Sequence, residues 1–167
     1  MAPRKDHDAP TRSLVIGCGN LLRGDDAAGP VLIRRLRDRG MRPGVECVDA
    51  GTGGIDVSAL MRGRDHVVIV DACCAAGEAG AIYEVPGEDV QRVPPPGGIN
   101  LHAMRWDHAL ALARRLLKEE CPRRVTVFLV EAEVFEPGAG LSSAVSRAVD
   151  ELVELVSARL DLPAGGA

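Results

Sequence analysis

Carboxylate side chains stand at the ends of several apolar runs in this 167-residue chain. Asp71 directly follows the almost purely apolar run Val67–Val70, and Glu131 follows a similar run. A carboxylate buried beside a strand without a partner costs several kcal/mol. Each of these acids therefore either accepts hydrogen bonds that hold the next loop or binds a ligand, and both interpretations are open.

Two adjacent aspartates, Asp25 and Asp26, follow the glycine-punctuated turn Gly17–Gly24 and precede an expected helix. A carboxylate at the start of a helix can cap unpaired N–H groups, which stabilises the helix by about 1 kcal/mol. Capping accounts easily for one aspartate and less easily for two. The pair is either a helix start or part of a binding site.

A histidine, His102, follows the proline-rich loop and stands at the expected start of a helix. Its role could be structural, but it can also face the same edge of the fold as Asp26 and Asp71. Two carboxylates and one imidazole with vacant coordination positions suit nickel, zinc, iron or manganese. The chain has no H-E-x-x-H pair and no G-x-S-x-G elbow, so a zincin or a serine hydrolase is not indicated.

Apolar runs alternate with amphipathic helical patterns, and this alternation predicts the elements that position the acids. Strands are expected at 13–16, 45–48, 67–70, 81–85 and 125–130, and helices at 27–39, 55–61, 102–119 and 144–160. The predicted fold is an α/β three-layer αβα sandwich with about five strands, mostly parallel. Strand 81–85 follows a turn too short for a parallel crossover, so it should run antiparallel to strand 67–70.

The carboxyl ends of parallel strands meet at one edge of a sheet, which is where ligands bind in such folds. Asp26, Asp49, Asp71 and Glu131 are all expected there. The helix over 102–119 should turn Met104, Ala111, Leu112 and Leu116 inward.

Composition bounds the function further. Apolar residues make up 46% of the chain, enough for one domain with its own core, which we place at residues 13–160 between flexible tails at 1–12 and 161–167. A net charge of −4 and 2% aromatic residues argue against nucleic-acid binding. No apolar run reaches the roughly 18 residues of a membrane span. Five cysteines without paired spacings favour a reduced, cytoplasmic protein.

A glycine turn after the first strand also raises the possibility of a dinucleotide site. The fingerprint G-x-G-x-x-G fails, however, because Leu22 stands where the third glycine is needed. Asp25 and Asp26 would also face a pyrophosphate with like charge. Asp49 ends the second strand, where a ribose-binding acid would lie, but the glycines after it equally suit an Asx-type turn. We therefore expect no nucleotide cofactor.

Four segments, in order, resemble the nickel–iron hydrogenase maturation endopeptidases. Gly17–Gly29 looks like their opening motif G-x-G-N-x-L-x-x-D-[DE]-x-x-G, and Asp49–Gly54 is similar to D-G-G-T-x-G, with Ala50 in place of the first glycine. Arg64–Ala72 resembles their third strand ending in Asp-Ala. Glu136–Ser142 resembles E-P-x-x-G-L-[ST]. Together the four motifs span about residues 14–160.

The resemblance implies an endopeptidase that removes the C-terminal extension of the hydrogenase large-subunit precursor after nickel insertion. By motif, the nickel-contacting residues fall on Asp26, Asp71 and His102, with the nickel supplied by the precursor. Asn100-Leu101-His102 stands where Ser-Pro-His is frequent, and His108 is the alternative histidine. We assign substrate binding to the second motif, namely to Asp49, Gly51, Thr52 and Gly53.

The resemblance leaves the group that activates water unassigned among Asp26, Asp71, His102 and Asp49. Asp25 keeps the helix-capping role. We expect a cytoplasmic monomer whose partner is the precursor, without nucleic acid or membrane. A second hypothesis is a metal-responsive chaperone that binds the same precursor without cutting it. Mass spectrometry of the precursor after incubation distinguishes the two.

Overall fold

The computed structural model describes residues 12–90 and 106–161. Of the expected tails at 1–12 and 161–167, only Arg12 and Asp161 are among the described residues, and Asp161 is the last residue of a helix rather than part of a tail. The central part of the proline-rich loop and His102 lie outside the described residues.

A five-stranded sheet forms the middle layer, with strand order β2-β1-β3-β5-β4. The strands are β1 (Ser13–Cys18), β2 (Val45–Gly51), β3 (His66–Cys73), β4 (Ile82–Pro86) and β5 (Arg124–Glu131). All neighbours are parallel except β4 and β5. The mostly parallel sheet with one antiparallel strand is confirmed.

The neighbour of β4 differs from the expectation, because β4 pairs with β5 rather than with β3. Most β5 side chains are buried, so this strand needs a neighbour on each side and packing on both faces. β4 is only partly buried and ends at Pro86, which lacks an N–H group. Proline is tolerated on an edge strand, and β4 takes that edge.

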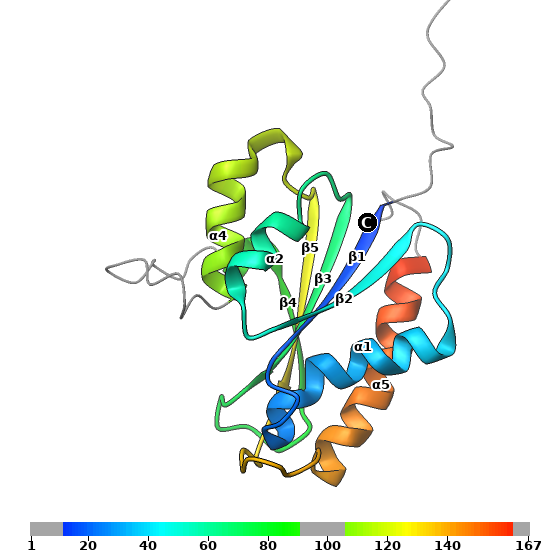
Figure 1. Ribbon diagram of the computed structural model, residues 1–167, viewed down its shortest axis with the longest axis vertical. Coiled ribbons are helices and arrows are strands. Elements are labelled where there is room, and N and C mark those ends of the chain that lie inside the picture. Colours follow the sequence, from blue (N-terminus) through cyan, green and yellow to red (C-terminus); the bar gives the residue numbers. More distant parts are fainter. Residues whose placement is uncertain (1–11, 91–105, 162–167) are drawn as a thin grey trace, which may run out of the picture.

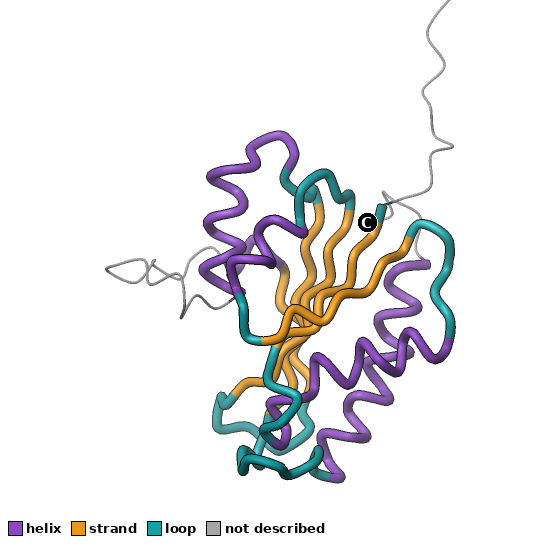
Figure 2. Tube along the Cα trace, in the orientation of Figure 1, coloured by secondary structure: helices purple, strands orange, loops and turns teal. Residues whose placement is uncertain are grey.

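Helices cover both faces of the sheet and make the outer layers (Figure 1). α1 and α5 lie on one face, while α2 and α4 lie on the other; Figure 2 shows the same three layers by element type. The helices are η1 (Gly24–Ala27), α1 (Ala28–Arg39), α2 (Gly54–Leu60), α3 (Gly87–Val90), α4 (Trp106–Leu117), η3 (Lys118–Glu120) and α5 (Ser143–Asp161).

Alternate residues of the central strands feed two separate cores, as the period of two along a strand requires. Leu14 and Ile16 of β1 belong to the core under α2 and α4. Val15, between them, belongs to the core under α1 and α5. α5 buries one face against this second core, and its buried residues include Val145, Val149, Leu152, Val153 and Val156.

The predicted inner face of α4 was wrong in part. Leu110, Ala113 and Leu117 are buried, whereas Leu116 is 64% exposed. Of the other predicted residues, Ala111 is exposed, Leu112 is partly buried against the core, and Met104 lies outside the described residues. This helix is rich in alanine and leucine, so the predicted face and the face shifted by one residue show similar spacings of apolar residues. Packing against α2 then selects which of the two is buried. Among the described residues, no helix combines the length and the apolar character that a membrane crossing requires.

Candidate active site

Asp26 and Asp71 line the same cavity, which has a volume of about 150 Å³. The sheet edge was expected to bring these two carboxylates together, and the structure places them so. The other lining residues come from the turn after β1, the turn after β2 and the start of α2: Cys18, Gly19, Gly51, Thr52, Gly53, Gly54 and Val57. The cavity thus joins the first three sequence motifs.

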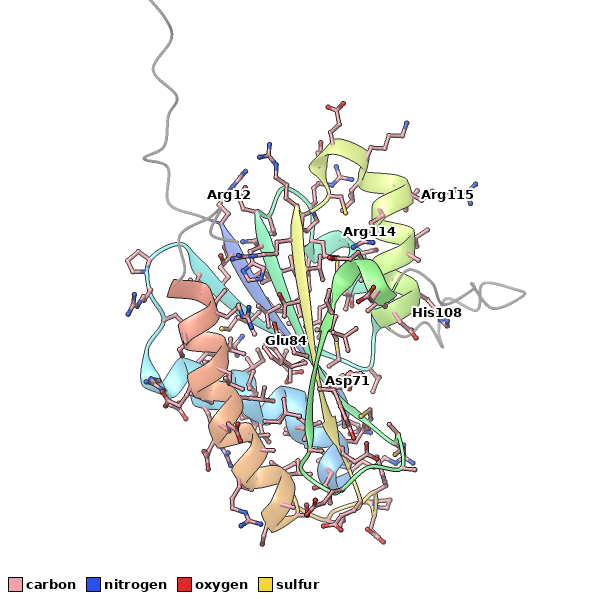
Figure 3. The ribbon with its side chains drawn as sticks, turned by 180° about the vertical axis from the view of Figure 1, so that it is seen from behind. Arg12, Asp71, Glu84, His108, Arg114 and Arg115 are labelled. Carbon is pink, nitrogen blue, oxygen red and sulfur yellow. The ribbon has the colours of Figure 1, made fainter. Side chains whose placement is uncertain are left out.

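Asp71 lies inside β3, where β1 stops pairing with it. The β1–β3 ladder ends at the pair Gly17 and Val70, while β3 continues beside β5 through Cys73. Asp71 therefore has no paired β1 residue on the side of β3 that faces β1. Its carboxylate is 9% exposed, and one oxygen accepts the N–H of Ala72 at 2.9 Å. Figure 3 shows Asp71 in the middle of the molecule.

Asp26 is placed by the turn that follows β1. Its Oδ2 accepts the backbone N–H of Asn20 at 3.3 Å, which closes the turn on itself. Gly19 has a φ of +128°, and a Cβ there would overlap the backbone oxygen of Asp26. Only glycine fits at this position, because both the backbone angle and the space exclude a side chain.

Asp25 has a different role from its neighbour, and the helix-capping expectation is wrong. Neither η1 nor α1 has a side-chain cap. The Asp25 carboxylate is fully buried and accepts three backbone N–H groups from the segment before α5: those of Glu133, Val134 and Ser142. A carboxylate can reach donors far away in sequence, and here tertiary packing supplied better ones than the adjacent helix end.

Two glycines hold the start of α1 directly against the sheet. A Cβ on Gly29 would overlap the backbone oxygen of Cys18, and a Cβ on Gly17 would overlap that of Gly29. Gly17 opens the glycine-punctuated turn of the sequence, but it has no positive φ. Its function is close packing of helix and strand, which fixes where the chain enters the cavity.

Asp49 lines a second cavity beside the first. This cavity has a volume of about 220 Å³ and shares Gly19, Gly51 and Thr52 with the Asp26–Asp71 cavity. Asp49 is exposed, and its Oδ1 accepts the N–H of Gly51 at 2.9 Å, which is the Asx-type contact expected from the sequence. The second motif therefore borders both cavities.

Glu131 is absent from both cavity linings. It is 4% exposed and accepts the N–H of Ala75, so it holds the loop after β3. Burial, with the carboxylate of Glu131 nearby, raises the pKa of the Cys73 thiol to about 11.

Cys18 lines the first cavity, although it was not predicted from the sequence as a site residue. In the sequence, only the position of Cys18 between Gly17 and Gly19 of the first motif could have identified it as a residue of the site.

The two described histidines contribute to neither cavity. Figure 3 shows His108 near the start of α4, well separated from Asp71. His66 is buried at the opposite end of β3, where Arg124 donates to its Nδ1 and its Nε2 lies 3.2 Å from the Thr126 hydroxyl. Burial and the charges of Arg124 and Arg159 lower the pKa of His66 to about 4. His66 is thus a structural residue.

The first cavity carries two carboxylates that could bind a metal ion. Asp26 and Asp71 offer hard oxygen ligands there. Within residues 12–90 and 106–161, no three metal-binding side chains are grouped closely enough to hold a metal ion by themselves. The third expected ligand, His102, lies outside the described residues.

Known proteins resemble this chain over most of its length. A family model described as hydrogenase maturation protease matches residues 30–159. The hydrogenase 2 maturation protease of Escherichia coli K12 is 31% identical over 156 residues, which cover 89% of this chain and 90% of that protein. A putative hydrogenase maturation protease of Methanocaldococcus jannaschii is 30% identical over 151 residues, covering 86% and 92%.

Solved structures agree with the sequence relatives. The hydrogenase maturating endopeptidase HybD from E. coli superposes with a TM-score of 0.75 at 30% identity, covering 90% of this chain and 92% of that one. A hydrogenase 2 maturation peptidase from a Thaumarchaeota archaeon superposes with a TM-score of 0.67 at 27% identity, covering 90% and 98%.

Proposed function

We propose a specific reaction for this protein from one premise: the chain belongs to the hydrogenase maturation protease family. It is accordingly a hydrogenase maturation endopeptidase. The proposal concerns its substrate. The enzyme removes the C-terminal extension of a nickel–iron hydrogenase large-subunit precursor after nickel insertion, and it recognises the precursor's nickel through Asp26, Asp71 and His102.

The observation that carries this proposal is the shared cavity of Asp26 and Asp71. Two carboxylates, Asp26 from η1 and Asp71 from β3, converge there and could serve as two ligands of a metal ion. A nickel ion held by thiolates of the precursor has ligands of its own and needs only a few more. Asp26 and Asp71 would supply two of them. His102, the third proposed ligand, lies outside the described residues.

Residues of this chain hold the two carboxylates in place for that encounter. Asp26 is fixed by the N–H of Asn20 and Asp71 by that of Ala72, so neither needs to reorganise when the precursor binds. The precursor's nickel would supply Lewis-acid polarisation of the scissile carbonyl. The residue that takes the proton from the attacking water is one of Asp26, Asp71, His102 and Asp49.

The test is cleavage of nickel-loaded precursor, followed by intact mass spectrometry. Wild-type enzyme should shorten this precursor and leave the nickel-free form intact. Asp26→Asn and Asp71→Asn should each slow cleavage by roughly 100-fold or more, the usual effect of removing one preorganised electrostatic group. His102→Ala should do the same. Asp150→Asn is a matched control, because Asp150 is an exposed α5 residue paired with Arg35.

Full activity in the Asp26, Asp71 and His102 variants would overturn the site assignment. Equal cleavage of nickel-free and nickel-loaded precursor would overturn the recognition of nickel. A bound but uncut precursor would favour the chaperone hypothesis instead. The cytoplasmic location and the monomeric state stay predictions from the sequence.

A further inference from the structure

The outer edge of β2 carries main-chain groups that point away from the sheet. β2 borders the sheet, and its only described neighbour is β1 (Figure 1). In a parallel ladder, alternate residues of a strand face the neighbour with both their N–H and C=O groups. Ser13 N–H donates to Gly44 C=O at 2.9 Å, so the even-numbered residues that follow Gly44 face β1. The odd-numbered residues Val45, Cys47 and Asp49 face outward.

Two contacts agree with this orientation and show which outward groups are already used. Val45 N–H donates to the C=O of Arg42 at 3.1 Å. The C=O of Cys47 accepts a hydrogen bond from Arg37 Nη2 at 2.7 Å. The N–H and C=O of Asp49 lie next along this edge, and no other described strand runs beside them. Asp49 is also one of the residues that line the second cavity.

The bond from Arg37 limits the part of this edge that an added strand can use. Arg37 Nη2 already bonds to the C=O of Cys47, whereas Asp49 follows with both its N–H and its C=O turned outward. A guest strand of either direction can bond to both groups of Asp49: an antiparallel guest through one opposed residue, and a parallel guest through two residues. The direction of the guest therefore depends on which of its ends has to reach the cavities.

We propose that the precursor's C-terminal extension docks on β2 as an antiparallel strand centred on Asp49. This inference rests on the proposed function, since the extension is the segment to be removed. β2 runs toward the cavities, so an antiparallel guest has its N-terminal end at the cavities and runs from there toward Val45. The scissile bond then lies at Asp26 and Asp71, and the residues to be released lie along β2.

The same geometry assigns the second cavity a ligand. Directly opposed residues of an antiparallel pair have side chains on the same face. The guest residue opposite Asp49 therefore places its side chain on the Asp49 side, over the cavity lined by Leu21 and Pro30. A volume of about 220 Å³ accommodates one side chain. Recognition thus combines main-chain bonds, which suit any sequence, with one side-chain subsite.

A pair of substitutions at Cys47 isolates the main-chain contribution. Cys47→Pro removes an outward N–H that would bond the guest, and it breaks no bond to β1. Cys47→Ala removes the same side chain and keeps the N–H. With nickel-loaded precursor, Cys47→Pro should lower kcat/KM roughly tenfold relative to Cys47→Ala, the effect of one lost hydrogen bond of about 1.4 kcal/mol. Melting curves of both variants check that the fold is retained.

A proline scan of the precursor's extension tests the same strand with wild-type enzyme, even if Cys47→Pro does not fold. Prolines at alternate positions should slow cleavage about tenfold, and those between them less than about threefold, because only every second guest N–H faces β2. The docking mode is overturned if the effect of proline on cleavage shows no alternation along the extension. It is also overturned if Cys47→Pro and Cys47→Ala both fold and have equal kcat/KM. Loss of wild-type cleavage would instead overturn the proposed function.

Discussion

Asp25 Oδ1 accepts a hydrogen bond of 2.6 Å from the backbone N–H of Ser142, a residue 117 positions later in the chain. Ser142 in turn caps α5, since its hydroxyl accepts the N–H of Val145. Three further main-chain bonds join the same segments, from the N–H of Gly24 to Ala139, from that of Asp25 to Val134 and from that of Gly138 to Leu22. The first and last sequence motifs thus form one hydrogen-bonded unit. Asp25 is the positioning residue that holds Asp26 at the cavity.

Replacing Asp25 should destabilise the fold. Asp25→Ala leaves three backbone N–H groups without their acceptor. Each buried N–H group left without an acceptor costs about 1–3 kcal/mol, so the loss of Asp25 should lower Tm by roughly 10 °C in a chain of this size. Differential scanning calorimetry measures this shift. Asp26→Ala should lower Tm much less, because Asp26 is partly exposed and accepts one long bond. Equal shifts in the two variants would contradict the division of roles.

A methyl group at Gly29 should separate α1 from the sheet. Gly29→Ala places a Cβ against the backbone oxygens of Cys18 and Val70, which cannot move aside. Overpacking of this kind costs about 1–3 kcal/mol. Urea unfolding should show the loss, and cleavage should fall as the cavity wall shifts. Gly140→Ala is the matched control, because a Cβ there meets nothing within 4 Å. An unchanged unfolding midpoint in Gly29→Ala would show that the contact is not tight.

His66 should make stability depend on pH. Burial and the two arginines lower its folded pKa to about 4, while the unfolded value is about 6.5. Between about pH 4 and pH 6.5, His66 is therefore protonated in the unfolded chain and neutral in the folded chain. The contribution of His66 is fully present above pH 6.5 and is lost as the pH falls toward 4, a change of about 2–3 kcal/mol.

The measurement compares wild type with His66→Gln in urea titrations from pH 4 to 7.5. Carboxylates contribute the same pH slope to both proteins, so the difference between them reports His66 alone. The difference in unfolding free energy between the two proteins should narrow below pH 6.5. A constant difference across this range would mean that His66 keeps an ordinary pKa.

Adjacent cysteines should differ in reactivity. Cys74 is exposed, whereas burial and Glu131 raise the pKa of Cys73 to about 11. Since the thiolate is the nucleophile, iodoacetamide at pH 8 should modify Cys74 first and Cys73 at least tenfold more slowly, on the order of its smaller thiolate fraction. Peptide mass mapping over time gives both rates. Equal rates would show that Cys73 is not protected as the structure indicates.

Mutation should show which of the two candidate histidines, His102 or His108, contributes to cleavage. His108 lines neither cavity, so His108→Ala should keep cleavage of nickel-loaded precursor within about threefold of wild type, the range of a surface substitution. Under the proposed ligand set, His102→Ala should slow cleavage by roughly 100-fold or more. The reverse result would assign the nickel contact to His108 and would require α4 to move toward Asp71.

Much of the fold was predictable because it follows from local patterns. Apolar runs such as Val67–Val70 and the amphipathic helix α5 indicated the α/β sandwich, and parallel strands align their carboxyl ends at one edge. That rule is sufficient to predict that Asp26 and Asp71 lie close together. The neighbour of β4 and the buried face of α4 were mispredicted, since each depends on which distant segment packs there.

By itself the sequence determined the order and type of the elements, the edge of the sheet that carries the acids and the family motifs. Only the tertiary structure separated the roles of Asp25 and Asp26, assigned Gly17 and Gly29 to helix–strand contact, and turned the Asp49 main chain outward. The physical reason is the distance along the chain over which each effect acts. Periodicity and turn chemistry act over a few residues, whereas a buried carboxylate or a close backbone contact depends on partners that only folding brings near, as with Asp25 and Ser142.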